Sequence, residues 1–352
     1  MKQKLINLGL MLASLYFSLF VVDVALFYLF VQDQYEFEVG LFKNDDKTRF
    51  GLTPNFKGFL YNRAGKTPVS INSHGYRGPE WKLDRDHEFM VVGDSFTFGI
   101  PLTYEEGFVS KTQKKVGDKA EFINLGVPGY GPGHILEVVK QNCALISPKH
   151  VFYMYYLNDT KFNNKKNYFT IVDGYLAAYA DKDGRPRSRE EILKGIQKGY
   201  GWKLWESLRF INIRTFLSER GIHPRQLLEK RVKTDMSRYI QSNNDGFSEE
   251  LTQRGARDIL EMKAVSQKCG ANFTMVILTT HAEAFYGVIE PATERLLGTL
   301  GNAVEIIDIR KFARKGVNLT QWYDGHYGPD GTDLVSNVLS GYVLGRYPEL
   351  RN

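Results

Sequence analysis

Five short apolar runs that alternate with longer amphipathic segments constrain this chain most. The runs expected to form strands are Glu88–Val92, Glu121–Asn124, His150–Tyr156, Asn272–Thr279 and Val304–Ile309. The expected helices are Glu105–Val116, His134–Ile146, Glu249–Lys268 and Asp330–Leu344. Apolar strands that alternate with helices are typical of a parallel sheet covered on both faces. The sequence therefore predicts an α/β fold, a flavodoxin-like three-layer α/β/α domain with a mostly parallel five-stranded sheet.

The N-terminus carries eighteen residues without a charge, 5–22. As a helix this run is roughly 27 Å long, close to the thickness of a hydrocarbon core. Lys2 and Lys4 precede it and an acidic flank, 33–38, follows it. By the positive-inside rule, we expect residues 1–32 to be an uncleaved, single-pass signal anchor in the inner membrane, with the rest on the periplasmic side.

Two alternatives to the anchor are a cleaved signal peptide and a buried helix of a soluble protein. The apolar run exceeds the usual length of a signal peptide core, and no A-x-A cleavage site follows it. Asp23 interrupts the run, so we expect it to lie near the outer interface or to pair with another helix.

The remaining chain divides by composition. Residues 33–85 are polar and turn-rich, and we expect an extended or hairpin-bearing segment that packs on the core. Residues 86–159 and 249–352 carry the strand and helix pattern, and 160–248 interrupt it as an inserted subdomain. Between Thr160 and Gly246 there are 18 Lys and Arg against 10 Asp and Glu.

A roughly helical apolar stripe lies within the insertion, and we expect it to pack on the main core. The alternatives are a lid, or a surface for an anionic polymer or lipid headgroups. The stripe consists of Trp202, Leu204, Trp205, Leu208, Ile211 and Phe216.

The net charge of +6 favours an acidic partner, but no nucleic-acid-binding motif is present, so we expect no nucleic acid partner. The two cysteines, Cys143 and Cys269, have no zinc-site spacing, and we expect small buried side chains in preference to a disulfide. No dinucleotide-binding fingerprint follows the first strand. We expect no metal and no cofactor, and the sequence indicates no oligomeric state.

Polar residues follow four of the expected strands. Ser95, in Gly93-Asp94-Ser95, follows the first, at the edge where parallel sheets bind ligands. The second runs into a glycine-rich loop in which Gly129 can point a backbone N–H at a ligand; a plain turn is the alternative. Asn158 follows the third, where its amide can donate to an oxyanion.

A histidine near the C-terminus can supply the base. Asp324 precedes His326 by two residues and can orient its imidazole, which can then take the proton of a serine hydroxyl. The alternatives are a solvent-exposed loop histidine and a rival base, His281, just past the fourth strand.

This ordered set resembles the motifs of the SGNH (GDSL-type) hydrolase family. The resemblance implies that Ser95 is the nucleophile, that Gly129 and Asn158 supply the oxyanion hole, and that His326 is the base. The segment Asn72–Arg77 looks like one found in membrane-anchored members, which accompany bacterial polysaccharide or cell-envelope assembly.

The function implied by this resemblance is a serine esterase acting on an O-acyl group of an extracytoplasmic glycan. Its expected partners are the membrane and an ester-bearing substrate, an acylated or anionic polysaccharide. Two alternatives are an O-acetyltransferase acting on polysaccharide and a non-catalytic polysaccharide-binding or assembly protein.

Three positions depart from the family's pattern. Tyr156 replaces the glycine of G-x-N-D, Asp324 stands two and not three residues before the histidine, and His326-Tyr327-Gly328 replaces H-P-N. The nucleophile and the oxyanion donors are unaffected, so the departures bear on the acid–base geometry.

Overall fold

The computed structural model describes residues 2–30, 36–62, 65–162, 169–178, 185–199, 204–208, 210, 212–213, 217, 247–320 and 325–351. Its centre is a five-stranded sheet in the order β11-β10-β7-β5-β6, and every neighbouring pair is parallel. The strands are β5 (His87–Gly93), β6 (Ala120–Gly126), β7 (His150–Tyr155), β10 (Asn272–Ile277) and β11 (Glu305–Asp308). Counted along the chain, the spatial order is 2-1-3-4-5, which is the flavodoxin-like order. The predicted fold class is confirmed.

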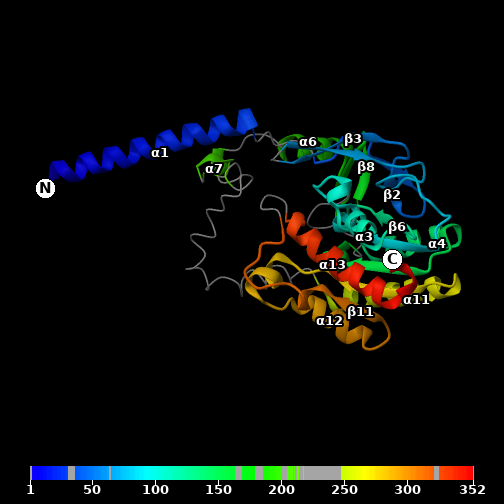
Figure 1. The fold of residues 1–352 in the computed structure, drawn as a ribbon. Helices are drawn as coiled ribbons and strands as arrows, with labels where there is room; N and C mark the ends of the chain where they lie inside the picture. The colour runs from blue at the N-terminus through cyan, green and yellow to red at the C-terminus, as the bar shows by residue number, and fades with distance from the viewer. Residues whose placement is uncertain are drawn as a thin grey trace.

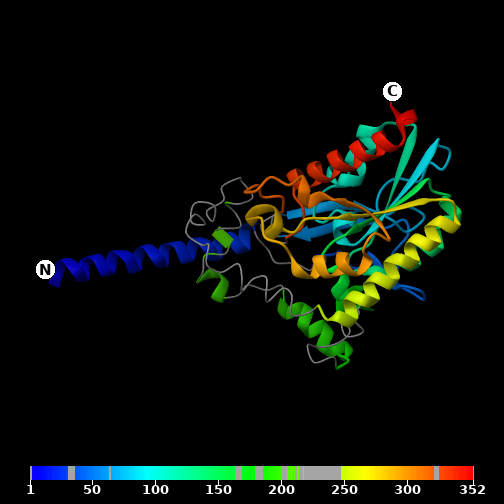
Figure 2. The ribbon, with the colours of Figure 1, turned by 90° about the horizontal axis from the view of Figure 1, so that it is seen from below.

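Helices cover both faces of the sheet. Figure 2 shows α11 and α13 on opposite sides of it. Met90 and Val92 of β5 pack with α4, α11 and α12, whereas Phe89 and Val91 pack with α3 and α13. Successive side chains of a strand point to opposite faces, so an uninterrupted apolar run supplies both cores. The helices are α3 (Phe108–Val116), α4 (Pro132–Ile146), α11 (Glu249–Lys268), α12 (Pro291–Leu300) and α13 (Pro329–Arg346).

The expected helices are present with small shifts at their ends. Gly107 separates a 3₁₀ turn, Tyr104–Glu106, from α3, so the expected single helix over 105–116 is two elements. Pro132 and Pro329 occupy the first turns of α4 and α13, where a missing N–H costs no hydrogen bond. Shorter helical elements are α2 (Ser95–Phe98), α5 (Asp159–Phe162), a π-helix (Ala282–Tyr286) and 3₁₀ turns at Ile309–Lys311 and Pro348–Leu350.

Two antiparallel hairpins precede the sheet. The first is β1 (Phe42–Asp45) with β2 (Arg49–Leu52), and the second is β3 (Lys57–Asn62) with β4 (Gly65–Ser70). Their buried side chains, together with Leu41 directly before β1, belong to the same apolar cluster as Met90 of the sheet. The hairpins therefore share the core of the main domain.

The N-terminal helix α1 (Lys2–Phe30) projects away from the rest of the molecule (Figure 1). Its segment Ile6–Leu29 has a mean hydropathy of 2.2 and is long and apolar enough to cross a membrane. Most of its apolar side chains are exposed, which a water-soluble helix would avoid.

Asp23 is fully buried despite its place in this helix. Its carboxylate accepts hydrogen bonds from Asn212 Nδ2 at 2.8 Å and from the Ile213 backbone N–H at 2.7 Å. The insertion thus covers the part of α1 that carries Asp23, and Tyr16 Oη donates a hydrogen bond to the Leu208 carbonyl at 2.7 Å. The contacts from Asn212 and Ile213 provide the donors that a buried carboxylate requires.

The described parts of the insertion are β8 (Phe169–Val172), β9 (Tyr175–Ala178), α6 (Arg189–Gly199) and α7 (Leu204–Ser207), besides α5 at its start. The apolar stripe was expected on the main core, and this is wrong for Leu204 and Leu208. They are 53% and 44% exposed, and α7 lies beside α1 (Figure 1). Trp202, Ile211 and Phe216, and the side chain of Trp205, lie outside the described residues.

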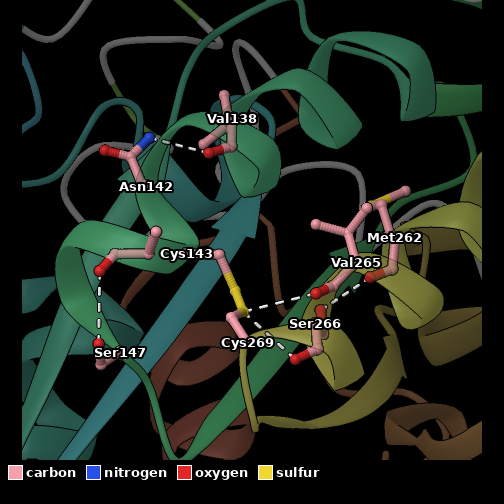
Figure 3. Close-up of a disulfide and its surroundings, with 9 residues drawn as sticks. Val138, Asn142, Cys143, Ser147, Met262, Val265, Ser266 and Cys269 are labelled. Carbon is pink, nitrogen blue, oxygen red and sulfur yellow. Dashed lines mark hydrogen bonds between the residues drawn. A yellow bond between two sulfur atoms is a disulfide. The ribbon is translucent and has the colours of Figure 1, made fainter.

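Cys143 and Cys269 form a disulfide, which corrects the preference for two unbonded cysteines. Figure 3 shows the bond joining α4 to the residue that ends α11. These helices pack side by side on one face of the sheet, which brings residues 126 positions apart within bonding distance. Sequence spacing cannot reveal such a pairing, because it depends on how two distant helices pack.

Replacing both cysteines by alanine should lower the free energy of unfolding by about 2–5 kcal/mol, because the bond restricts the unfolded chain. Urea denaturation of the full chain in detergent micelles measures this. Reductant should destabilise the wild type and leave the double variant unchanged; equal stability of both proteins without reductant would contradict the bond.

Candidate active site

Ser95 begins α2 directly beyond the end of β5. Asp94 caps this short helix by accepting a hydrogen bond from Phe96 N at 2.9 Å. Gly126, the β6 partner of Gly93, faces the backbone of Thr97 and Phe98 so closely that a Cβ would collide with it. The missing side chain lets α2 pack against the strand ends, which leaves Ser95 at the carboxyl edge of the sheet.

His326 reaches Ser95 from the loop that precedes α13. Its Nε2 lies 2.8 Å from Ser95 Oγ, although the two residues are 231 positions apart in sequence. This distance is within the range required for proton transfer between a nucleophile and its base. The side chain of Ser95 is nearly buried and His326 is half-buried, so little water surrounds the pair.

Tyr327 fixes the histidine loop to the sheet. Its hydroxyl donates to the Thr279 carbonyl at 2.8 Å and accepts from the Thr279 N–H at 2.9 Å. Thr279 lies just past β10, so both hydrogen bonds join the loop to the same sheet edge. The position after His326 is thereby held by a strand end.

Phe96 contacts two of the residues that depart from the family's pattern. Its ring stacks on Tyr156 with centroids 3.8 Å apart and meets Tyr327 edge-on at 5.0 Å. The ring of His326 lies 4.8 Å from the same phenylalanine. The two tyrosines therefore belong to one aromatic cluster, which packs beside the imidazole of His326.

Gly129 lies in the loop after β6. The Val127 N–H donates to the Gly93 carbonyl at 3.1 Å, which ties this loop to the end of β5 beside the serine. Gly129 has a φ of +81°, which favours glycine, and Phe169 of the insertion lies 3.1 Å from the place of its missing Cβ. The β8–β9 hairpin thus forms part of the wall beside this glycine.

Asn158 follows β7 and is half-buried. Its side chain lies close to the buried carboxyl group of Asp94 and lowers the pKa of that group. A primary amide carries two N–H donors, so Asn158 can donate to a substrate oxygen. The structure therefore brings Asn158 to the same strand edge as Ser95.

Asp324 lies outside the described residues. The rival base His281 lies after β10, where its Nδ1 is 3.4 Å from Thr320 Oγ1 and its ring stacks on Phe285. The imidazole within hydrogen-bonding distance of Ser95 Oγ is that of His326, so the geometry favours His326 as the base.

Arg77 supports the serine turn from behind, a role that the sequence did not reveal. The buried guanidinium donates to the carbonyls of Phe98, Gly99 and Leu102, at 2.9, 2.9 and 2.6 Å. Burial lowers the pKa of Arg77 to about 10, which leaves it charged at neutral pH. The segment Asn72–Arg77 thus holds the chain that follows α2.

Two buried carboxyl groups lie under the serine. Burial raises the pKa of Asp94, although the Phe96 N–H, His326, Asn158 and Ser95 oppose the shift. Burial also raises the pKa of Asp159 well above its ordinary value, and the neighbouring Asp94 adds to this. In the described part of the chain, no group of three or more His, Cys, Asp and Glu residues could hold a metal ion.

No family model and no curated protein matches the chain. Similar solved structures include TesA, with 12% identity and a TM-score of 0.41 over 73% of this chain and 97% of that one. Est24, a carbohydrate acetylesterase from Sinorhizobium meliloti, has 11% sequence identity and a TM-score of 0.39, over 74% of this chain and 100% of that one. Est2A, an acetyl xylan esterase from the rumen bacterium Butyrivibrio proteoclasticus, has 11% identity and a TM-score of 0.38, over 80% of this chain and 70% of that one.

Replacing Tyr327 by phenylalanine should destabilise the fold by about 1–3 kcal/mol, because the buried N–H and carbonyl of Thr279 lose their partner. Urea denaturation of the full chain measures the loss. An unchanged denaturation midpoint would show that the two hydrogen bonds do not hold the histidine loop.

Proposed function

We propose that this protein is a serine esterase of the SGNH type. The observation that carries the proposal is the 2.8 Å contact between Ser95 Oγ and His326 Nε2 at the carboxyl edge of a parallel sheet. A serine hydroxyl is a weak nucleophile until a neighbouring base takes its proton. A glycine loop and an asparagine amide beside the same serine suit the tetrahedral intermediate of acyl transfer.

The proposed reaction has two steps. His326 takes the proton of Ser95, whose Oγ attacks the ester carbonyl, and the protonated imidazole then gives that proton to the leaving alcohol. The N–H groups of Ser95 and Gly129 and the amide of Asn158 stabilise the oxyanion. Water, deprotonated by His326, attacks the acyl-serine, and the acid leaves as Ser95 regains its proton.

The proposed location is the outer side of the inner membrane, with α1 as the anchor. Lys2 and Lys4 favour a cytoplasmic N-terminus. The Cys143–Cys269 disulfide supports an oxidising compartment, because cytosolic thiols are kept reduced. In a bacterial host, protease added to intact spheroplasts should digest the domain after α1; full protection until lysis would contradict this topology.

The proposed substrate is an O-acylated glycan. Its support is the anchored, extracytoplasmic location together with the basic excess of the insertion, which favours an anionic polymer. Hydrolysis and acyl transfer to a sugar hydroxyl share the acyl-serine intermediate. Incubation with a short-chain aryl ester, with and without glycan, separates them: release of free acid without glycan indicates hydrolysis, and turnover that requires glycan indicates transfer.

Ser95→Ala should reduce ester turnover to the background rate while the protein stays folded, because no other group supplies the attacking oxygen. Aryl ester hydrolysis and labelling by a fluorophosphonate measure the loss. Ser110→Ala, a serine on α3 outside the site, is the control. Undiminished ester turnover by the Ser95 variant would exclude the mechanism. If the wild type hydrolyses no ester and is not labelled by the fluorophosphonate, yet binds glycan, the protein is a binding protein.

Asn158→Ala should lower kcat by about 10²–10³-fold, the usual cost of one oxyanion donor. KM should change less, because the bond to the oxyanion forms in the transition state. Steady-state kinetics with an aryl ester measure both constants. A loss confined to KM would place Asn158 in substrate binding.

A further inference from the structure

Asp94 and Asp159 form a buried carboxyl pair directly behind the nucleophile. Both side chains are fully buried, and the carboxyl group of Asp94 lies close enough to that of Asp159 to raise its pKa. Asp94 comes from the end of β5 and Asp159 from the start of α5, so the contact joins two strand ends. The sequence does not reveal this pair, because Asp94 and Asp159 are 65 positions apart.

The donors around the pair are few. Asp94 accepts from the Phe96 N–H at 2.9 Å and from Ser95 Oγ at 3.4 Å, and Asn158 lies close enough to lower its pKa. One oxygen of Asp159, Oδ2, accepts from Tyr153 Oη at 2.8 Å and from the Tyr156 N–H at 3.3 Å. The other oxygen, Oδ1, is buried and has no hydrogen-bond partner among the described residues. A bare carboxylate oxygen in that position would bear the full cost of desolvation.

The charges near the pair do not compensate for two negative groups. The titratable side chains that face it are Tyr153 and Tyr155 on β7, and His326 and Tyr327 before α13. Of these, the imidazole of His326 is the one that can carry positive charge. Two adjacent carboxyl groups in a buried site cannot both ionise near neutral pH, because each charge disfavours the other.

We propose that Asp94 and Asp159 hold one proton between them, that Asp159 carries it on Oδ1, and that it donates this proton to the carboxylate of Asp94. A hydroxyl on Oδ1 gives that oxygen the partner it lacks. Asp94 keeps the charge because it accepts the Phe96 N–H and faces His326, which both favour the ionised form. One negative charge then remains at the site.

This arrangement gives Asp159 a positioning role in the serine mechanism proposed above. Asp94 Oδ2 lies 3.4 Å from Ser95 Oγ and could accept the hydroxyl proton that must go to His326. The bond from Asp159 holds the Asp94 carboxylate in place. The remaining charge favours the imidazolium that forms when His326 takes the serine proton.

The shared proton has a measurable linkage to folding. The folded chain binds a proton at Asp159 that the unfolded chain releases above a pH of about 4. Between that pH and the raised pKa of Asp159, stability therefore falls as pH rises, and each pH unit changes the unfolding equilibrium constant by up to tenfold, or about 1.4 kcal/mol. Asp159→Asn keeps the shape and an N–H donor for Asp94 but binds no such proton.

The test compares the full chain with Asp159→Asn and with Asp333→Asn, an exposed carboxyl on α13 that serves as control. Urea unfolding in detergent micelles between pH 5 and 8 should show the tenfold change per pH unit disappearing in Asp159→Asn alone. Infrared difference spectra at pH 7 should show a protonated carboxyl band that this variant lacks. If the unfolding equilibrium of all three proteins depends equally on pH, or if the wild type shows no protonated carboxyl band, the proposal of a shared proton is wrong.

Activity tests the positioning role separately. Asp159→Asn should retain ester turnover within about tenfold, whereas Asp159→Leu, which has no donor, should lose at least tenfold in kcat at unchanged KM. Equal activity of the two variants would overturn the role. If Ser95→Ala retains full turnover while the carboxyl band is present, the serine mechanism fails and the shared proton stands.

Discussion

The hydrogen bond between Ser95 and His326 depends on a constraint of the backbone: parallel strands end at one edge of their sheet. β5, β6 and β7 are neighbours, so the residues that follow them meet although the chain separates them widely. His326 does not follow a strand. It reaches the same edge because the hydroxyl of the next residue, Tyr327, hydrogen-bonds to the backbone of Thr279 after β10. The ends of β5, β7 and β10 therefore position the residues of the site.

Two of the departures from the pattern of the SGNH family, Tyr156 and Tyr327, have a common physical basis. Tyr156 and Tyr327 both contact Phe96, and the ring of His326 packs on the same side chain. A glycine and a proline at these positions would leave that space unfilled. Here aromatic packing, in place of a restricted backbone, holds the imidazole of His326 beside Ser95.

Elements outside the sheet tie the molecule together at a larger scale. The disulfide joins α4 to the end of α11 and so encloses the insertion in a covalent loop. The insertion meets the main domain where Phe169 lies against Gly129, and it meets α1 where Asn212 and Ile213 satisfy Asp23. The same segment thus contacts both the wall of the site and the helix proposed as the anchor.

The strands, most helices and the polar residues at the strand ends could be predicted from the sequence, because apolar periodicity is local and parallel topology directs strand ends to one edge. The sequence already favoured His326 over His281 as the partner of Ser95. Tertiary structure alone decided that Cys143 and Cys269 bond and that Asp94 and Asp159 lie together. It also placed Leu208 beside α1, away from the core expected for it. These outcomes depend on how distant segments pack, and residue spacing along the chain contains no measure of that distance.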